Sequence, residues 1–318
     1  MAKDTPAAIR VIAFPGAPNL PTFAAVTQGS FAEEGLSVEI ATTPSSVFQA
    51  QKIAAGEFEI AFTAFDNVVA YSEGQGAPDG GNPDYCVIMG ATQLELSFVV
   101  APEIKTYQHL KGRSIALDAV STGFAFVLYD MLERGGLNKG DYSLAAVGAT
   151  PQRWQSVKDG AHAGTLTIEP FTSIARRAGF NVLSASTQLY ETYQGGIVAA
   201  RRSWLKENPE PAKAFVRGYL KGLAWTLDPA NREAAEALLL SKMPEIQPAA
   251  AKPVMASLLS PRSGLTPNAD ILPDGMRRVL ALRSRYGTGG QNLTDIDKYL
   301  ELSLFRDVVQ TQRDQEST

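Results

Sequence analysis

The fold is decided by residues 9–73, which read IRVIAFPGAPNLPTFAAVTQGSFAEEGLSVEIATTPSSVFQAQKIAAGEFEIAFTAFDNVVAYSE. Short apolar, β-rich runs in this stretch predict strands at 9–14, 37–41 and 58–63. Pro21 near the start and a glycine at the end predict a helix at 21–29. A short helical turn is predicted at 31–36, and helices at 45–55, ended by Gly56, and at 66–73. A β-α-β-α-β-α order is typical of a parallel sheet covered by helices.

A second series of the same kind follows further along the chain. Strands are predicted at 85–90, 97–101, 114–117, 142–147 and 163–167, and helices at 123–134 and 152–158. From about Leu205 onward the pattern is helical, with segments at 209–227, 232–242, 274–286 and a shorter one at 294–304. A second α/β unit inserted into the first fits this order. We therefore expect one lobe from residues 1–98 and 199–318 and another from 99–198, with crossings near Val99 and at 195–199.

The composition excludes several classes of function. The chain has 318 residues, which at roughly 150 residues per domain predicts two domains. Its 29 Lys and Arg against 33 Asp and Glu give a net charge of −4, so the basic excess of a nucleic-acid binder is missing. One cysteine excludes an intramolecular disulfide, and two histidines leave few ligands for zinc. We expect no metal, no cofactor and no nucleic-acid partner.

The compartment is left open by the sequence. No apolar stretch approaches the length of about 20 residues that spans a bilayer. The start, Met1 to Pro6, has no apolar region of the kind found in a signal peptide. Either the protein is cytoplasmic, or an export signal has been removed and replaced by a start methionine.

Several motifs resemble those of a known family. Residues 28–38 read QGSFAEEGLSV, 54–61 read AAGEFEIA, 109–116 read HLKGRSIA and 168–171 read IEPF. In this order and spacing they resemble ABC-transporter solute-binding proteins of the type that binds nitrate, taurine, alkylsulfonates and thiamine-pyrimidine precursors. The resemblance implies a type II periplasmic-binding fold, in which two α/β lobes are joined by two strands. It also implies a ligand held between the lobes, and a membrane permease as partner.

Ligands of open α/β sheets bind outside the carboxyl ends of the strands. In the first lobe this rule selects Phe14, Asn19, Ser45, Ser46, Phe65 and Asp66. In the second it selects Ser121, Thr122, Gly123, Gln152, Thr167 and Glu169. Tyr190 and Tyr193 precede the return crossing, where both lobes can reach. We expect these residues to line the ligand site.

The segment Ser121–Gly123 carries the strongest signal for an anion. It stands where a helix is predicted to begin, so free backbone N–H groups and the positive end of the helix dipole would point into the cleft. Alternatively, Ser121 and Thr122 only cap that helix, and the same alternative holds for Ser45 and Ser46. Asp66 is expected as the N-cap of the helix that follows it.

The aromatic residues and the scarcity of arginine indicate the kind of ligand. Phe14, Phe65, Tyr190 and Tyr193 flank the predicted mouth, which favours a small organic carboxylate or sulfonate with an apolar or aromatic body. A bare inorganic ion would prefer a wet, polar pocket. Arg153 follows Gln152 and is expected to be solvated, which argues against a ligand with several carboxylates.

We therefore predict a monomeric receptor that delivers a small organic anion to a permease, either periplasmic or lipid-anchored outside the cytoplasm. The alternative is a lyase or hydrolase on the same fold, using Glu169 or Asp66. No catalytic residue is expected, because Cys86 lies in an apolar strand as a buried, inert thiol and neither histidine is placed to act as a base.

Overall fold

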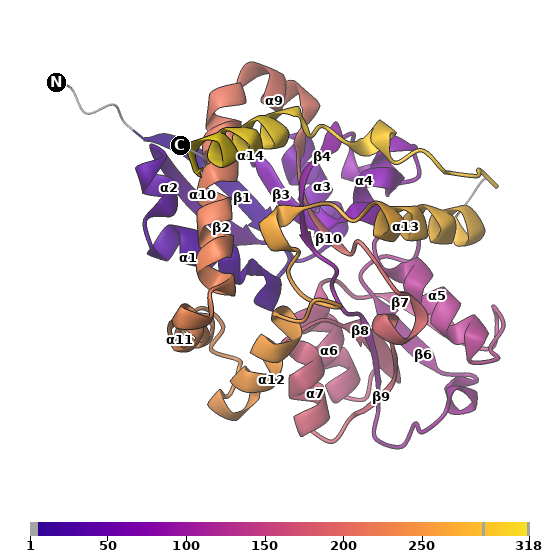
Figure 1. The fold of residues 1–318 in the computed structure, drawn as a ribbon. Coiled ribbons are helices and arrows are strands. Elements are labelled where there is room, and N and C mark those ends of the chain that lie inside the picture. Colours follow the sequence, from indigo (N-terminus) through magenta and orange to yellow (C-terminus); the bar gives the residue numbers. More distant parts are fainter. Residues whose placement is uncertain (1–5, 288–289, 317–318) are drawn as a thin grey trace.

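The computed structural model describes residues 6–287 and 290–316, so Met1–Thr5 lie outside the described part of the chain. The chain forms two five-stranded sheets, each flanked by helices, which we call lobe 1 and lobe 2 (Figure 1). The strand order is β2-β1-β3-β10-β4 in lobe 1 and β7-β6-β8-β5-β9 in lobe 2. The predicted α/β architecture with two lobes is confirmed.

The strands of both sheets are short. Those of lobe 1 are β1 (Ala7–Ala13), β2 (Leu36–Thr42), β3 (Ile60–Ala64), β4 (Tyr85–Thr92) and β10 (Gly196–Arg201). Those of lobe 2 are β5 (Ser97–Val100), β6 (Ser114–Leu117), β7 (Ser143–Ala146), β8 (Gly164–Thr167) and β9 (Asn181–Ala185).

One strand in each sheet runs against the other four. In lobe 1, β1 pairs in parallel with β2 and β3, whereas β10 is antiparallel to β3 and β4. In lobe 2, β6 pairs in parallel with β7 and β8, whereas β5 is antiparallel to β8 and β9. The reversed strands, β5 and β10, are the first strands that form after the chain crosses from one lobe to the other. The remaining strands end at the edge of their sheet that faces the other lobe.

The two connections between the lobes lie side by side. Residues 93–96 lead from β4 to β5 and residues 190–195 lead back to β10, and the Gly195 N–H donates to the Gln93 carbonyl at 2.9 Å. The crossings thus come a few residues before the expected boundaries at 98 and 198. The reason is that the apolar runs after each crossing already belong to the next sheet.

Helices α1–α4 cover lobe 1 and α5–α8 belong to lobe 2. They are α1 (Leu20–Thr27), α2 (Ser30–Glu33), α3 (Ser46–Ala54), α4 (Phe65–Ser72), α5 (Ala125–Arg134), α6 (Thr150–Lys158), α7 (Phe171–Arg177) and α8 (Ser186–Leu189). The remaining helices are α9 (Arg202–Glu207), α10 (Pro209–Leu227), α11 (Arg232–Lys242), α12 (Pro248–Leu258), α13 (Pro273–Tyr286) and α14 (Ser303–Glu316).

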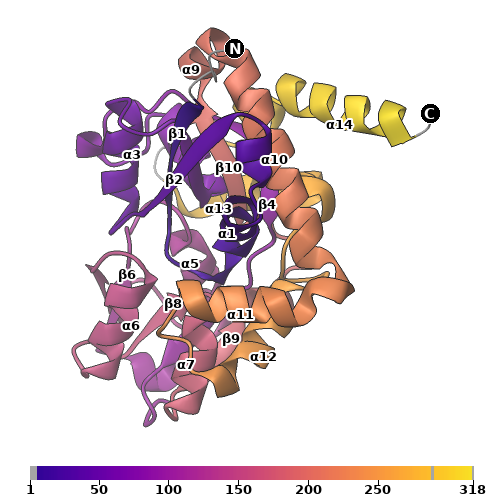
Figure 2. The same ribbon diagram turned by 90° about the vertical axis from the view of Figure 1, so that its left-hand side faces the viewer.

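The helical tail packs mainly on lobe 1 but also reaches lobe 2. Helix α10 lies against α1, while α12 contacts α7 and α13 lies between α4 and α5 (Figures 1 and 2). The prediction of a helix at 294–304 is wrong, because the last helix, α14, begins only at Ser303. Helix α12 was not predicted, since Pro253 lies inside it and masks the helical pattern.

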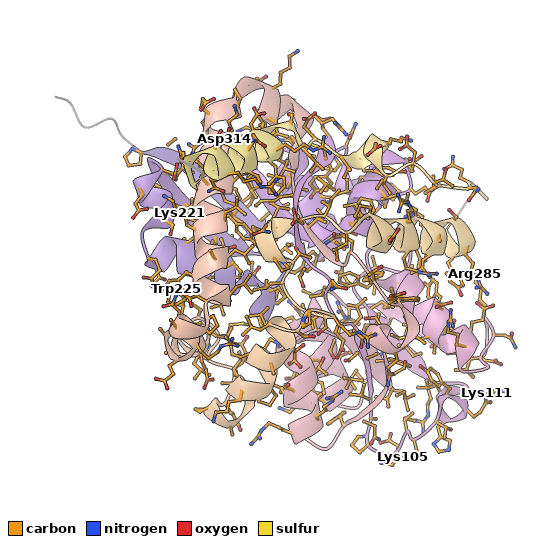
Figure 3. The ribbon with its side chains drawn as sticks, in the orientation of Figure 1. Lys105, Lys111, Lys221, Trp225, Arg285 and Asp314 are labelled. Atoms are coloured by element: carbon orange, nitrogen blue, oxygen red, sulfur yellow. The ribbon has the colours of Figure 1, made fainter. Side chains whose placement is uncertain are left out.

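The hydrophobic core continues from one lobe into the other. One cluster joins β3, α4 and α13 to β5, β6 and α5, with Phe65, Phe98 and Phe126 among its members. Charged side chains such as Lys105 and Lys111 lie on the outer surface of lobe 2 (Figure 3). Among the described residues, every helix is too short or too polar to cross a membrane.

Candidate ligand-binding site

A cavity of about 90 Å³ lies between the two sheets, lined by strand ends and loops of both lobes. Most of its wall is apolar, formed by Phe14, Pro18, Phe62, Ala64, Ala91, Leu94, Leu117, Ala119, Phe124, Ala125, Leu166, Ile168 and Ile197. The polar side chains in the wall are Asn19, Thr63, Asn67, Thr92, Asp118, Thr122, Thr150 and Arg153. The space is of the scale that holds a few waters or one small organic molecule.

Arg153 places a buried positive charge in this wall. The side chain projects from α6 and the residue is only 5% exposed. Its guanidinium donates to the Gly148 carbonyl at 2.7 Å, the Leu166 carbonyl at 3.1 Å, Thr150 Oγ1 at 3.1 Å and Thr165 Oγ1 at 3.0 Å. Burial lowers the pKa of Arg153 to about 10, which leaves it charged at neutral pH. The expectation that Arg153 is solvated is wrong.

The reason is the orientation of α6. This helix buries Thr150, Arg153, Trp154 and Val157, spaced three and four residues apart, on its inward face. The four acceptors around the guanidinium are neutral oxygens, so they compensate for lost hydration without neutralising the charge. Arg153 therefore keeps a buried positive charge in the cavity wall.

Asp118 is the carboxylate of the cavity wall, and the strand-end search did not select it. It follows β6, and its two oxygens accept the backbone N–H of Ser46 at 3.1 and 3.2 Å. Ser46 is the first residue of α3 in lobe 1, so Asp118 reaches across the cleft to the N-terminus of that helix. Its negative charge also acts on Arg153 and opposes the fall in the pKa of that residue.

Asn67 was also missed, although it lies one residue beyond a selected position. The residue is 3% exposed and lines the cavity, and its Nδ2 donates to Thr63 Oγ1 at 3.0 Å. Within the described part of the chain, its Oδ1 has no hydrogen-bond partner. A buried amide oxygen without a partner is costly, so a donor group on a ligand would stabilise it.

The Ser121–Gly123 turn does reach the cavity, but not as a helix cap. Thr122 and Gly123 line the wall, whereas Ser121 is exposed. Helix α5 begins only at Ala125 with Phe124 as its N-cap, so the alternative in which Ser121 and Thr122 cap this helix is wrong. The Gly123 N–H, expected to face a ligand, interacts with the Asp66 carboxylate instead.

Four selected residues come from the first two loops of lobe 1. Phe14 and Asn19 line the cavity, and Asn19 Nδ2 donates to the Phe14 carbonyl at 2.8 Å. Ser45 is the N-cap of α3, where its Oγ accepts the Phe48 N–H at 3.2 Å, as the capping alternative predicted. Ser46 contacts lobe 2 through its backbone and lies outside the cavity wall.

Phe65 and Asp66 face away from the cavity. Helix α4 begins at Phe65 with Ala64 as its N-cap, so the expectation that Asp66 caps the helix is wrong. Phe65 is fully buried and packs edge-on against Tyr299 at 5.9 Å. Burial raises the pKa of Asp66, and an ion pair with Arg283 opposes this rise. Because α4 begins at Phe65, Asn67 lines the cavity and Phe65 and Asp66 do not.

Three further residues selected in lobe 2 lie outside the wall. Gln152 is exposed on α6. Thr167 is buried and its hydroxyl lies 2.8 Å from that of Thr172. Glu169 accepts from the Ser173 hydroxyl at 2.9 Å, which holds its carboxylate at the start of α7.

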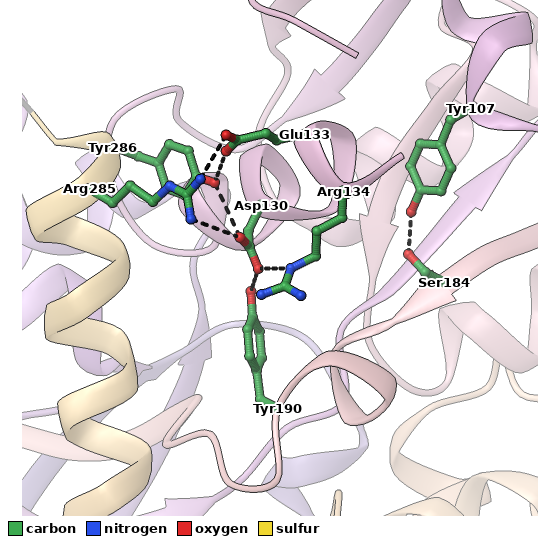
Figure 4. Close-up of polar contacts among 8 residues, drawn as sticks. All are labelled: Tyr107, Asp130, Glu133, Arg134, Ser184, Tyr190, Arg285 and Tyr286. Atoms are coloured by element: carbon green, nitrogen blue, oxygen red, sulfur yellow. Dashed lines mark hydrogen bonds and ion pairs between the residues drawn. The ribbon is translucent and has the colours of Figure 1, made fainter. Parts of the chain in front are cut away.

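The two tyrosines of the return crossing pack on each other instead of on the cavity. Their rings stack with centroids 5.8 Å apart. Tyr190 donates to Asp130 at 2.7 Å (Figure 4). Tyr193 is 5% exposed and lies beside Gly275 of α13. Neither residue lines the cavity, because both turn toward α5 and α13.

The groups considered for catalysis or metal binding do not gather at the cavity. Cys86 is buried in β4 as expected, and burial raises its thiol pKa to about 12. His162 Nδ1 lies 2.9 Å from Ser114 Oγ at the far end of β6. Among the described residues, no cluster of three or more His, Cys, Asp or Glu side chains is arranged to hold a metal ion.

Comparison with known proteins agrees with this architecture. A family model described as NMT1/THI5-like matches residues 18–232. The search of curated proteins gives no match. Among solved structures, a protein from Bordetella bronchiseptica RB50 is 20% identical with a TM-score of 0.78, over 96% of this chain and 98% of that chain.

Two further solved structures carry names that state a ligand. The periplasmic nitrate-binding protein NrtA from Synechocystis PCC 6803 is 16% identical with a TM-score of 0.80, over 96% of this chain and 88% of that one. The periplasmic aliphatic sulphonate-binding protein SsuA from Escherichia coli is 18% identical with a TM-score of 0.66, over 93% and 97%. At such identities the likeness establishes the fold, which is the fold that the motifs predicted.

Proposed function

Because the chain belongs to the NMT1/THI5-like family, we propose that it is the solute-binding receptor of an ABC importer and captures a small organic anion in the cavity between its lobes. The nitrate- and sulphonate-binding names of two structural neighbours support a receptor of this kind. The neighbours' periplasmic location supports a place outside the cytoplasm, and a membrane permease would be the partner that receives the solute.

The observation that carries the proposal is the buried guanidinium of Arg153. Its four hydrogen bonds go to neutral oxygens, and the residue lines a mainly apolar cavity. Four of the five guanidinium N–H donors are already used, so a carboxylate or sulfonate entering this space would gain about one charge-assisted hydrogen bond, worth about 1.5–3 kcal/mol.

The apolar wall favours an organic anion over a bare inorganic one. Aromatic and aliphatic side chains such as Phe14, Phe124 and Leu166 surround the charge. Covering apolar ligand surface contributes about 25 cal/mol per Å², which nitrate or bicarbonate cannot use. The volume of about 90 Å³ limits the ligand to a compact molecule. We therefore propose a carboxylate or sulfonate with a short apolar or aromatic body.

Contacts across the cleft support trapping by closure. The Ala149 N–H donates to the Pro44 carbonyl at 2.8 Å, and the Ala17 N–H donates to the Glu169 carbonyl at 3.1 Å. Each bond joins a loop of lobe 1 to a loop of lobe 2, so this conformation is closed. We propose that the two lobes move as two units about the paired crossings at 93–96 and 190–195, and that the receptor works as a monomer.

A thermal-shift screen tests the proposal, using nitrate, bicarbonate, and aliphatic and aromatic carboxylates and sulfonates. Ligands that bind the native state raise its melting temperature by mass action. We expect organic anions to raise it and the inorganic ions to leave it unchanged. A response to nitrate or bicarbonate alone would contradict the organic-anion proposal.

Recovery of the bound compound separates a receptor from an enzyme. After incubation, mass spectrometry should return the ligand unaltered. Any turnover would favour a lyase or hydrolase instead. The two carboxylates considered for such chemistry, Asp66 and Glu169, are held by Arg283 and Ser173 and lie outside the cavity wall.

A further inference from the structure

Helix α13 of the C-terminal tail lies across both lobes beside the ligand cavity. It packs against α4 of lobe 1 and α5 of lobe 2. The contact with lobe 2 includes an ion pair between Arg285 and Glu133 at 2.7 Å and hydrogen bonds from the Tyr286 hydroxyl to Glu133 and Asp130 (Figure 4). The C-terminal tail therefore connects the two lobes through residues that are distant in sequence from the crossings at 93–96 and 190–195.

Arg283 is the most deeply buried link in this contact. Its guanidinium binds both oxygens of Asp66 at 2.7 Å and the Gln75 amide oxygen at 2.8 Å, all within lobe 1. The same guanidinium donates to the Ser121 carbonyl of lobe 2 at 3.0 Å and lies 4.8 Å from the centre of the Phe126 ring. One side chain thus contacts both lobes at once.

Asp66 contacts the other end of the Ser121–Gly123 turn of lobe 2. The Gly123 N–H of lobe 2 interacts with its carboxylate, while Arg283 holds the Ser121 carbonyl. The residue between these two anchors is Thr122, which with Gly123 forms part of the cavity wall. The pair therefore bonds to one end of this turn through Arg283 and interacts with the other end through Asp66.

We propose that Asp66 and Arg283 are positioning residues of the binding site, which hold the Ser121–Gly123 turn from lobe 1 and so couple lobe closure to completion of the cavity wall. The proposal rests on the proposed function, because it assigns the pair a role in that same site. A buried ion pair contributes little net stability once the cost of removing two charges from water is counted. The contacts that the pair makes with the lobe 2 turn give it a role beyond stability.

The test measures the ligand-free protein first. Hydrogen exchange monitored by mass spectrometry reports on the 118–124 segment. The distance between spin labels at Ala55→Cys, the exposed residue that follows α3, and Lys158→Cys, the exposed last residue of α6, reports closure. The buried native Cys86 remains unlabelled. Both measurements are repeated with saturating benzenesulfonate.

Three variants and one control separate positioning from stability. Asp66→Asn and Arg283→Lys each weaken the Asp66–Arg283 ion pair, which we call the bridge. The double change Asp66→Asn with Arg283→Gln removes both charges, so that no unpaired buried charge threatens folding. The control is Arg277→Gln, an exposed residue of α13 that pairs with Asp274 on the same helix. Circular dichroism and the unfolding midpoint establish that each variant is folded.

We expect exchange in segment 118–124 to become about tenfold faster or more in the bridge variants, with a shift toward longer label distances, while the control matches the wild type. The proposal would be overturned if the folded double variant showed wild-type hydrogen exchange in segment 118–124 and wild-type label distances. It would also be overturned if the wild-type turn were unprotected and its labels stayed far apart both with and without benzenesulfonate. If benzenesulfonate has no effect but the variants still loosen the turn, the proposed ligand class fails and the bridge stands.

Discussion

Replacing Arg153 by methionine removes the positive charge of the cavity while keeping much of the side chain's length. A guanidinium has five N–H donors. Four hydrogen bonds to the Gly148 and Leu166 carbonyls and to the Thr150 and Thr165 hydroxyls occupy all but one of them. A ligand anion would thus gain about one charge-assisted bond, worth roughly 1.5–3 kcal/mol, so Arg153→Met should weaken binding about 10- to 150-fold.

Titration calorimetry with the strongest organic anion from the thermal-shift screen measures this loss. Arg153→Lys should retain part of the affinity, because the charge remains while the forked donors are lost. Arg113→Met, which removes an exposed arginine just before β6, serves as the matched control and should bind like the wild type. An Arg153→Met protein that is folded and binds the anion within about twofold of the wild type would refute the reasoning.

Three further results are expected. Phe14→Ala should weaken benzenesulfonate binding about tenfold, or roughly 1.4 kcal/mol, by calorimetry, because Phe14 lines the apolar wall; equal affinity would place the ligand body elsewhere. The hydrogen bond from Tyr286 lowers the pKa of Glu133, so closure should weaken as the pH falls below the ordinary glutamate pKa of 4.5. X-ray scattering should then record a larger radius of gyration, and Glu133→Gln should make this change smaller. A radius of gyration that does not depend on pH would contradict the prediction. Cys86 should not react with Ellman's reagent until denaturant is added, because burial raises its pKa to about 12; rapid reaction of the native protein would show that β4 opens.

The order of strands and helices could be predicted because hydrophobic periodicity and turn residues act locally. The helices at 209–227 and 232–242 and the strand at 114–117 begin and end where the sequence places them. The elements that were missed have weak local signals. Strand β9 is only partly buried along most of its length, and α12 contains a proline.

The candidate site was predicted only in part, because the strand-end rule selects loops but not the direction of each side chain. Phe14, Asn19, Thr122 and Gly123 lie in the cavity wall. Asn67 was missed because α4 begins one residue earlier than expected, which rotates Asp66 away and Asn67 inward.

Arg153 was missed for a different reason. Arginine is almost never fully buried unless it is paired, so a solvated side chain was the reasonable expectation from sequence. Its burial depends on carbonyls of Gly148 and Leu166, which come from two separate segments of lobe 2. Only the folded chain brings these acceptors together.

A crystal structure of the protein bound to its strongest organic anion tests the central claim most directly. We predict that a carboxylate or sulfonate oxygen lies within hydrogen-bonding distance of the Arg153 guanidinium, with the apolar body of the ligand against Phe14 and Leu166 and both lobes closed around it. A ligand bound outside this cavity, or one whose anionic group points away from Arg153, would contradict the account.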